Sequence, residues 1–280
     1  MNELEIRNLC KSYPGFSLDH LNLALPRGCI MGLIGENGAG KSTIIKLILD
    51  MVRKDSGDIS IFGRSNQENI KELKEEIGVV LDEVEFPECL TANQIGRMMK
   101  NTYRNWEEEL YVNYLKKLSV PADKAFKDFS RGMKMKCGIA VAMSHHPRLL
   151  ILDEATSGLD PVVRDEVTGM LSEFTRDENH AILISSHIIS DLEKICDYIA
   201  FLHEGKLLLC EEKDILLEKY GIIRCTLEQL LELEPSAVKG KRHSPYGVEV
   251  LVDREAVPAS MNASPIDIEQ LFVFMVKEGK

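Results

Sequence analysis

The chain has 280 residues, 44% of them hydrophobic and 28% charged, which suits a globular protein with one large domain and at most a small appendage. Its formal net charge of -11 disfavours broad binding to nucleic acid, because an acidic surface repels phosphate backbones. No apolar run approaches the ~20 residues that cross a bilayer, and the acidic start of the chain lacks an apolar signal core. We therefore expect a cytoplasmic chain without a membrane span of its own.

Apolar segments of strand length alternate with segments of helical periodicity. Strands are predicted where apolar residues alternate or run continuously, at 4–9, 18–25, 29–34, 59–62, 149–152, 181–185, 198–203 and 206–210. Helices are predicted over 41–51, over most of 91–146, from Pro161 onward and over 188–196. Such alternation predicts an α/β fold with a largely parallel sheet.

The pattern weakens beyond about residue 216, where prolines and glycines interrupt it. One strand is still predicted over 247–252 and one amphipathic helix over 266–276. We therefore divide the chain into a main domain, residues 1–215, and a small α+β appendage, residues 216–280.

A phosphate-binding loop is predicted between the strand at 29–34 and the helix that follows. The motif G-x-x-x-x-G-K-S/T is matched in full by Gly35, Glu36, Asn37, Gly38, Ala39, Gly40, Lys41 and Ser42. Lys41 is expected to contact the β- and γ-phosphates, the Ser42 hydroxyl to bind Mg²⁺, and Thr43 to lie beside them. Alone, the loop indicates only a nucleoside triphosphate, since backbone N–H groups at a helix N-terminus bind any phosphate group.

Two adjacent carboxylates follow the strand at 149–152. Asp153 is expected at the carboxyl edge of the sheet, beside the phosphate loop, where it can hold Mg²⁺ directly or through water. Adjacent residues of an extended segment point to opposite sides. Glu154 is therefore expected to reach a different point, suited to orienting or deprotonating an attacking water.

Four further segments make residues 3–215 similar to the nucleotide-binding subunits of ATP-binding cassette transporters. They are the signature-like segment Phe129-Ser130-Arg131-Gly132-Met133, the loop Ser157-Gly158-Leu159-Asp160, His187 after the strand at 181–185, and Tyr13. The resemblance implies a P-loop NTPase domain with a mainly parallel sheet, an antiparallel β subdomain and a helical subdomain over about 84–146. The chain looks most like bacterial exporters of antibiotics or lantibiotic peptides.

The resemblance also implies functional roles. Tyr13 would stack on adenine, His187 would act with Glu154 on the γ-phosphate and the water, and Ser130 and Gly132 would bind the ATP held by a second cassette in a head-to-tail dimer. The cofactors would be ATP and Mg²⁺. The partner would be a separate integral membrane permease that docks near residues 82–99 and holds the chain at the cytoplasmic face of the membrane.

The chain departs from the family pattern at two places. Phe129, Arg131 and Met133 replace the usual Leu, Gly and Gln of the signature, and Asp82 stands where the family has a metal-binding glutamine. Asp82 is a candidate Mg²⁺ ligand, since aspartate also offers oxygen. Two alternatives stay open: an ATPase-weak regulatory cassette of a heterodimer, and a soluble cassette protein unrelated to transport. The substrate, the direction of transport and homodimer versus heterodimer are also open.

Overall fold

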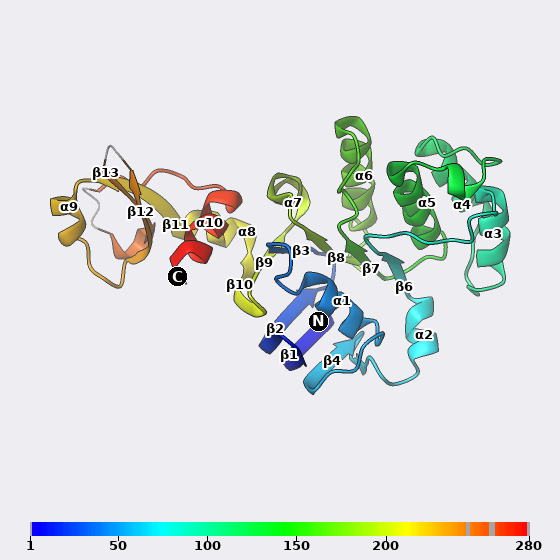
Figure 1. Ribbon diagram of the computed structural model, residues 1–280, viewed down its shortest axis with the longest axis horizontal. Coiled ribbons are helices and arrows are strands. Elements are labelled where there is room, and N and C mark those ends of the chain that lie inside the picture. The colour runs from blue at the N-terminus through cyan, green and yellow to red at the C-terminus, as the bar shows by residue number, and fades with distance from the viewer. Residues whose placement is uncertain (1, 245–246, 258–260, 279–280) are drawn as a thin grey trace.

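The computed structural model describes residues 2–244, 247–257 and 261–278, and the rest of the predicted appendage lies outside these ranges. Within these ranges, three sheets organise the molecule (Figure 1). The largest lies in the middle, the helices α3 to α5 lie at one end, and the C-terminal sheet lies at the opposite end. Within the described residues, no helix has the length and apolar character needed to cross a membrane.

The central sheet has the strand order β10-β9-β3-β8-β7-β6. Its strands are β3 (Ile30–Gly35), β6 (Ile77–Val80), β7 (Leu149–Asp153), β8 (Ala181–Ser186), β9 (Tyr198–His203) and β10 (Lys206–Glu212). All neighbours run parallel except β10, which is antiparallel to β9. The mainly parallel sheet predicted from the sequence is thus confirmed.

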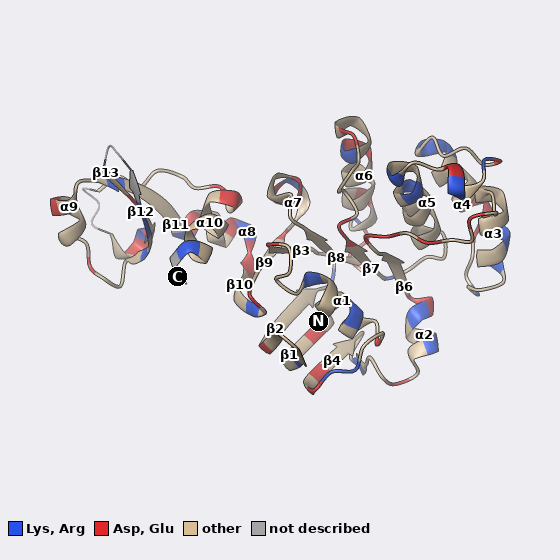
Figure 2. Ribbon diagram, viewed as in Figure 1, with Lys and Arg blue, Asp and Glu red and all other residues tan. Residues whose placement is uncertain are grey.

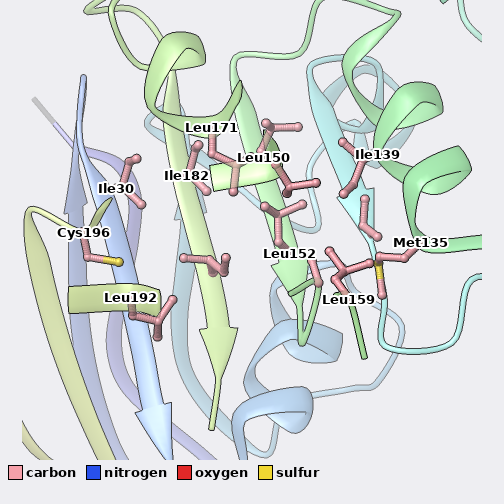
Figure 3. Packing of buried hydrophobic residues seen from close by; sticks show 14 of the residues in the cluster. Ile30, Met135, Ile139, Leu150, Leu152, Leu159, Leu171, Ile182, Leu192 and Cys196 are labelled. Carbon is pink, nitrogen blue, oxygen red and sulfur yellow. The ribbon is translucent and has the colours of Figure 1, made fainter. Parts of the chain in front are cut away.

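Both faces of this sheet are covered, which explains the continuous apolar runs of its strands. On one face, Ile30, Leu150 and Ile182 pack against three helices, α5 (Arg131–Met143), α6 (Pro161–Phe174) and α7 (Ile189–Ile195) (Figure 3). On the other face, Met31 and Leu183 pack against α1 (Lys41–Ile48) and the second sheet. Successive residues of one strand therefore stabilise two different layers.

The second sheet is antiparallel and contains β1 (Asn2–Tyr13), β2 (Phe16–Pro26), β4 (Ser56–Ile61) and β5 (Arg64–Ser65) in the order β2-β1-β4-β5. A short helix, α2 (Ile70–Glu75), leads from this sheet to β6. The helix predicted over 41–51 ends earlier, at Ile48. Asp50 adopts a left-handed conformation with φ 52°, and the Met51 amide donates to the Lys46 carbonyl, so the chain turns away there.

The predicted helical region contains α3 (Ala92–Lys100), α4 (Glu108–Lys117), a 3-10 turn (Phe126–Asp128) and α5. Tyr111 joins these elements, since its buried hydroxyl donates to the Ala92 carbonyl at 2.9 Å and its ring packs against Gly96. Thr91 begins α3 with a capping box formed with Gln94. Tyr111 also reaches α5, with 3.8 Å between its hydroxyl oxygen and Cys137 Sγ, so it connects α3, α4 and α5.

The C-terminal part contains α8 (Lys213–Lys219), β11 (Tyr220–Cys225), α9 (Leu227–Leu231), β12 (Val238–Ser244), β13 (Gly247–Asp253), a 3-10 turn (Arg254–Ala256) and α10 (Ile268–Glu278). The strand and the helix predicted here correspond to β13 and α10, while β11 and β12 carried no clear signal. The three strands form an antiparallel sheet in the order β11-β13-β12. Helix α10 returns to the main core, where Phe272 meets Phe201 with ring centroids 5.1 Å apart.

Candidate functional site

A pocket of about 400 Å³ opens where β3, β7 and β8 end. Its lining comes from segments far apart in the sequence: Phe16, Glu36, Asn37, Gly38, Gly40, Lys41, Ser42, Thr43, Asp82, Arg131, Glu154, Ser157 and His187. Most of the residues predicted to bind nucleotide therefore lie around one cavity. Gly35 and Ala39 lie behind this lining and are buried.

The loop between β3 and α1 has a backbone shape that requires glycine. Gly38 and Gly40 have φ values of +83° and +114°, which side chains of L residues rarely allow. An added Cβ at Gly40 would lie 2.7 Å from Phe16 Cζ and 2.8 Å from Leu18 Cδ2. The loop thereby presents the N-terminus of α1 to the pocket, and backbone N–H groups there favour a phosphate.

Lys41 supplies a cation to this loop. Its side chain is only 6% exposed, and Nζ donates to the Gly35 carbonyl at 2.7 Å. The same Nζ lies 3.4 Å from Glu154 Oε1. A buried ammonium held by backbone carbonyls can exchange these partners for phosphate oxygens, so the residues present fit a nucleoside triphosphate.

Glu154 connects Lys41 to His187. Its Oε2 lies 2.7 Å from His187 Nδ1, and its side chain is 12% exposed. The prediction that Glu154 lies in an extended segment is wrong: β7 ends at Asp153, and Glu154 is left-handed with φ 52°. Its amide donates to the Ser185 carbonyl at 3.0 Å, which stabilises this turn. The turn aims the carboxylate into the pocket.

Asp153 lies deeper than Glu154. It is 4% exposed and accepts a hydrogen bond from the Ser185 hydroxyl of the neighbouring strand β8. The phosphate loop follows β3, and Asp153 ends β7. Because β8 lies between these two strands in the sheet, Asp153 is not on the strand next to the phosphate loop. Asp153 is not among the described residues that line the pocket, although its neighbour Glu154 is.

Phe16 is the aromatic residue that lines the pocket, and sequence reasoning missed it. Tyr13, predicted to stack on adenine, is 42% exposed, lies outside the described lining, and has the Lys11 ammonium 5.3 Å from its ring centroid. The two aromatics are cross-strand partners in the β1–β2 hairpin. The turn at Pro14-Gly15 between them was the available signal, since a hairpin brings both residues to the same end.

The signature-like segment begins α5. The Ser130 hydroxyl accepts from the Met133 amide at 3.3 Å and caps the helix. Ser130 is exposed, and Gly132 faces the loop at Gly158 and Leu159, so neither is among the described residues that line this chain's own pocket. Arg131 does line it and bonds Asp82, with 2.6 Å between Nη2 and Oδ1.

This fold and site define a nucleotide-binding domain of the P-loop class. Comparison with protein families identifies the family: the model described as "ABC transporter" matches residues 18–157. The chain belongs to the ABC transporter family, whose domain binds ATP.

Curated relatives agree with this assignment. The chain is 39% identical over 200 residues to the bacitracin transport ATP-binding protein BcrA of Bacillus licheniformis, covering 69% of this chain but only 63% of that protein. It is 39% identical to the lantibiotic transport ATP-binding protein SrtF of Streptococcus pyogenes, over 75% of this chain and 91% of that protein. An uncharacterised ABC transporter ATP-binding protein of Bacillus subtilis (strain 168), YhcH, matches 98% of this chain and is covered over 91% of its length, at 31% identity.

Solved structures agree in fold. An ATP-binding subunit of an ABC transporter has a TM-score of 0.70 and 28% identity, over 75% of this chain and 90% of that chain. The dimeric cassette MJ0796 bound to ADP and Pi has a TM-score of 0.68, over 75% of this chain and 98% of that chain. At 21% identity, the second likeness concerns the fold alone.

Proposed function

We propose that this chain is the ATP-hydrolysing subunit of an ABC exporter and drives transport through a separate membrane permease. The observation that carries the proposal is the position of Glu154, whose two carboxylate oxygens lie 3.4 Å from Lys41 Nζ and 2.7 Å from His187 Nδ1 beside the phosphate loop. A carboxylate so placed can act as a base on a water at the end of the triphosphate.

The first step is binding. The triphosphate lies along the loop from Gly38 to Ser42, and Lys41 leaves the Gly35 carbonyl and Glu154 to bind phosphate oxygens. This exchange frees one oxygen of Glu154. The base is therefore released by the same event that brings the substrate.

The second step is hydrolysis. Glu154 accepts a proton from the attacking water, the oxygen of that water bonds to the γ-phosphorus, and the bond from that phosphorus to the bridging oxygen breaks to leave ADP and phosphate. His187 holds the other carboxylate oxygen through Nδ1 and fixes the direction of the base. With 46% of its side chain exposed, His187 also has room to approach the γ-phosphate.

The donors around the pocket fit a Mg²⁺ ion, which would neutralise charge on the β- and γ-phosphates. Ser42 lies in the lining and Asp153 offers a buried carboxylate held by Ser185. Asp82 is the third candidate ligand, and Arg131 binds one of its oxygens.

We further propose that two chains assemble head to tail. Ser130 and Gly132 lie at the start of α5, outside the described lining of their own pocket, where the helix N-terminus can meet a phosphate held by a second copy. The dimeric state of MJ0796, a cassette of the same fold, supports the assembly of two chains. Twofold symmetry would make the two composite sites equivalent.

The proposed permease contact is the loop after β6, which is rich in acidic residues (Figure 2). An adjoining groove of about 420 Å³ is lined by Asp82, Glu83, Val84, Glu85, Phe129, Arg131, Lys134 and Met135. Its mixture of acidic and apolar side chains suits a short amphipathic segment with basic residues. Docking there would hold the chain at the cytoplasmic face of the membrane.

The names of BcrA and SrtF support amphiphilic peptide antibiotics as the transported substrates.

The test is Mg²⁺-dependent ATP hydrolysis by the purified chain and by Glu154→Gln, with the oligomeric state measured with and without ATP. We expect loss of turnover by at least about a hundredfold in Glu154→Gln with ATP binding retained, and an ATP-dependent dimer. Glu173→Gln, an exposed residue of α6 paired with Lys117, is the matched control and should keep full activity. A Glu154→Gln variant that hydrolyses ATP as fast as the control would show that another residue is the base.

A further inference from the structure

The ion pair between Arg131 and Asp82 forms the wall shared by the nucleotide pocket and the adjoining groove. Both residues line both cavities. Their side chains are 59% and 47% exposed, so water can replace either partner and the pair can separate without leaving a buried charge. The importance of the pair therefore lies in its position and not in its contribution to stability.

An anion near the guanidinium of Arg131 offsets an unfavourable position on its helix. It is the first residue of α5, where the positive end of the helix dipole disfavours a cation. Its stem lies across the loop at Gly158, since an added Cβ there would be 3.5 Å from Arg131 Cδ. Asp82 provides that anion, with 2.6 Å between Arg131 Nη2 and Asp82 Oδ1.

The described lining of the pocket contains three carboxylates, Glu36, Asp82 and Glu154, and two basic side chains, Lys41 and Arg131. A triphosphate adds several negative charges. The Nη2 group of Arg131 becomes available to these phosphates when it leaves Asp82, and the uncovered carboxylate then repels the same phosphates. A divalent cation removes this repulsion because it binds both carboxylate and phosphate oxygens.

We propose that Arg131 is a phosphate-binding residue and that Asp82 competes with phosphate for its guanidinium. The exchange of Arg131 between Asp82 and phosphate makes the pocket bind metal-complexed nucleotide in preference to free nucleotide. The inference rests on the proposed function, because it assumes that the pocket binds ATP. It adds a role for Arg131 and a means of discrimination to that site. Arg131 and Asp82, two of the residues at which the chain departs from the family pattern, thereby act as one unit.

The experiment measures equilibrium dissociation constants of the full chain for a non-hydrolysable ATP analogue, once in EDTA and once in excess Mg²⁺. Asp82→Asn should tighten metal-free binding about three- to tenfold, since Arg131 is then free, and so should reduce the ratio of the two constants. Arg131→Gln should weaken metal-free binding by a similar factor, and Arg131→Lys should restore part of it. Arg131→Gln should cost more affinity in the Asp82→Asn background than in the parent.

The exposed pair Lys117 and Glu173 supplies the control, and the variants Lys117→Gln and Glu173→Gln should leave both constants unchanged. Thermal melts of all variants check that they are folded. One outcome is that the parent binds the analogue while every variant keeps the same ratio of the EDTA and Mg²⁺ dissociation constants within about twofold. That result would refute the proposed exchange between Arg131 and Asp82 without contradicting the nucleotide pocket. If the parent binds no analogue in either condition, the proposed function itself fails.

Discussion

Three glycine-to-alanine substitutions separate the backbone strain of the phosphate loop from its packing. Gly40 has φ +114°, and an added Cβ would lie 2.7 Å from Phe16 Cζ. Gly38 has φ +83° but no heavy atom within 4 Å of an added Cβ. Gly169 is an exposed residue within α6, also with open space around it. Alanine at Gly40 would therefore meet both backbone strain and close packing, and alanine at Gly38 would meet backbone strain alone. Alanine at Gly169 would meet neither.

The expected changes in the free energy of unfolding follow from these differences. A strained L residue costs about 1–2 kcal/mol, so Gly38→Ala should destabilise the chain by that amount. Displacing Phe16 and Leu18 adds about 1–2 kcal/mol, which gives Gly40→Ala a total of about 2–4 kcal/mol. Gly169→Ala should stabilise the chain by about 0.5–1 kcal/mol, because alanine favours a helix interior.

Urea unfolding of the three variants and the parent, followed by far-UV circular dichroism, measures these changes, and ATP binding is measured in parallel. We expect weaker binding for both loop variants and unchanged binding for Gly169→Ala. If Gly40→Ala and Gly38→Ala have the same urea midpoint, the contact with Phe16 and Leu18 has no energetic weight. If both loop variants have the same urea midpoint as Gly169→Ala, the argument from backbone conformation is refuted.

Three further predictions concern separate parts of the molecule. Phe16→Ala should weaken ATP binding several-fold more than Tyr13→Ala, because Phe16 lines the pocket and Tyr13 does not; equal effects in a binding titration would contradict this placement. Thr91→Ala should lower the free energy of unfolding by about 1 kcal/mol in urea titrations, since the Thr91 hydroxyl accepts from the Gln94 amide; no change would mean that the capping box contributes nothing. Burial lowers the pKa of His145 from 6.5 to about 4. The unfolded chain therefore binds the extra proton between these values, and stability should fall by up to about 3 kcal/mol as the pH drops through this window. The dependence of the free energy of unfolding on pH should become weaker in His145→Gln. An unchanged dependence would show that other groups cause it.

The central sheet and the phosphate loop were predictable because their signals are local. A continuous apolar run indicates a strand buried on both faces, and the glycine spacing before Lys41 reflects the backbone that phosphates require. Both features are confirmed in β3, β7, β8 and the turn into α1. The division into residues 1–215 and 216–280 stays a prediction, and the return of α10 to Phe201 ties the two parts together.

Tertiary structure decided which side chains meet. Arg131 and Asp82 are far apart in the sequence, and no periodicity indicates that they form an ion pair. The turn at Glu154 depends on the Ser185 carbonyl of a neighbouring strand, and the hairpin that carries Tyr13 and Phe16 places only Phe16 in the lining. The sequence by itself therefore determined the fold class, the family and the loop that binds phosphate, because residue spacing sets local backbone shape. The partners of Glu154 and Arg131 were decided only by packing between distant segments, since local patterns do not specify how strands and helices are brought together.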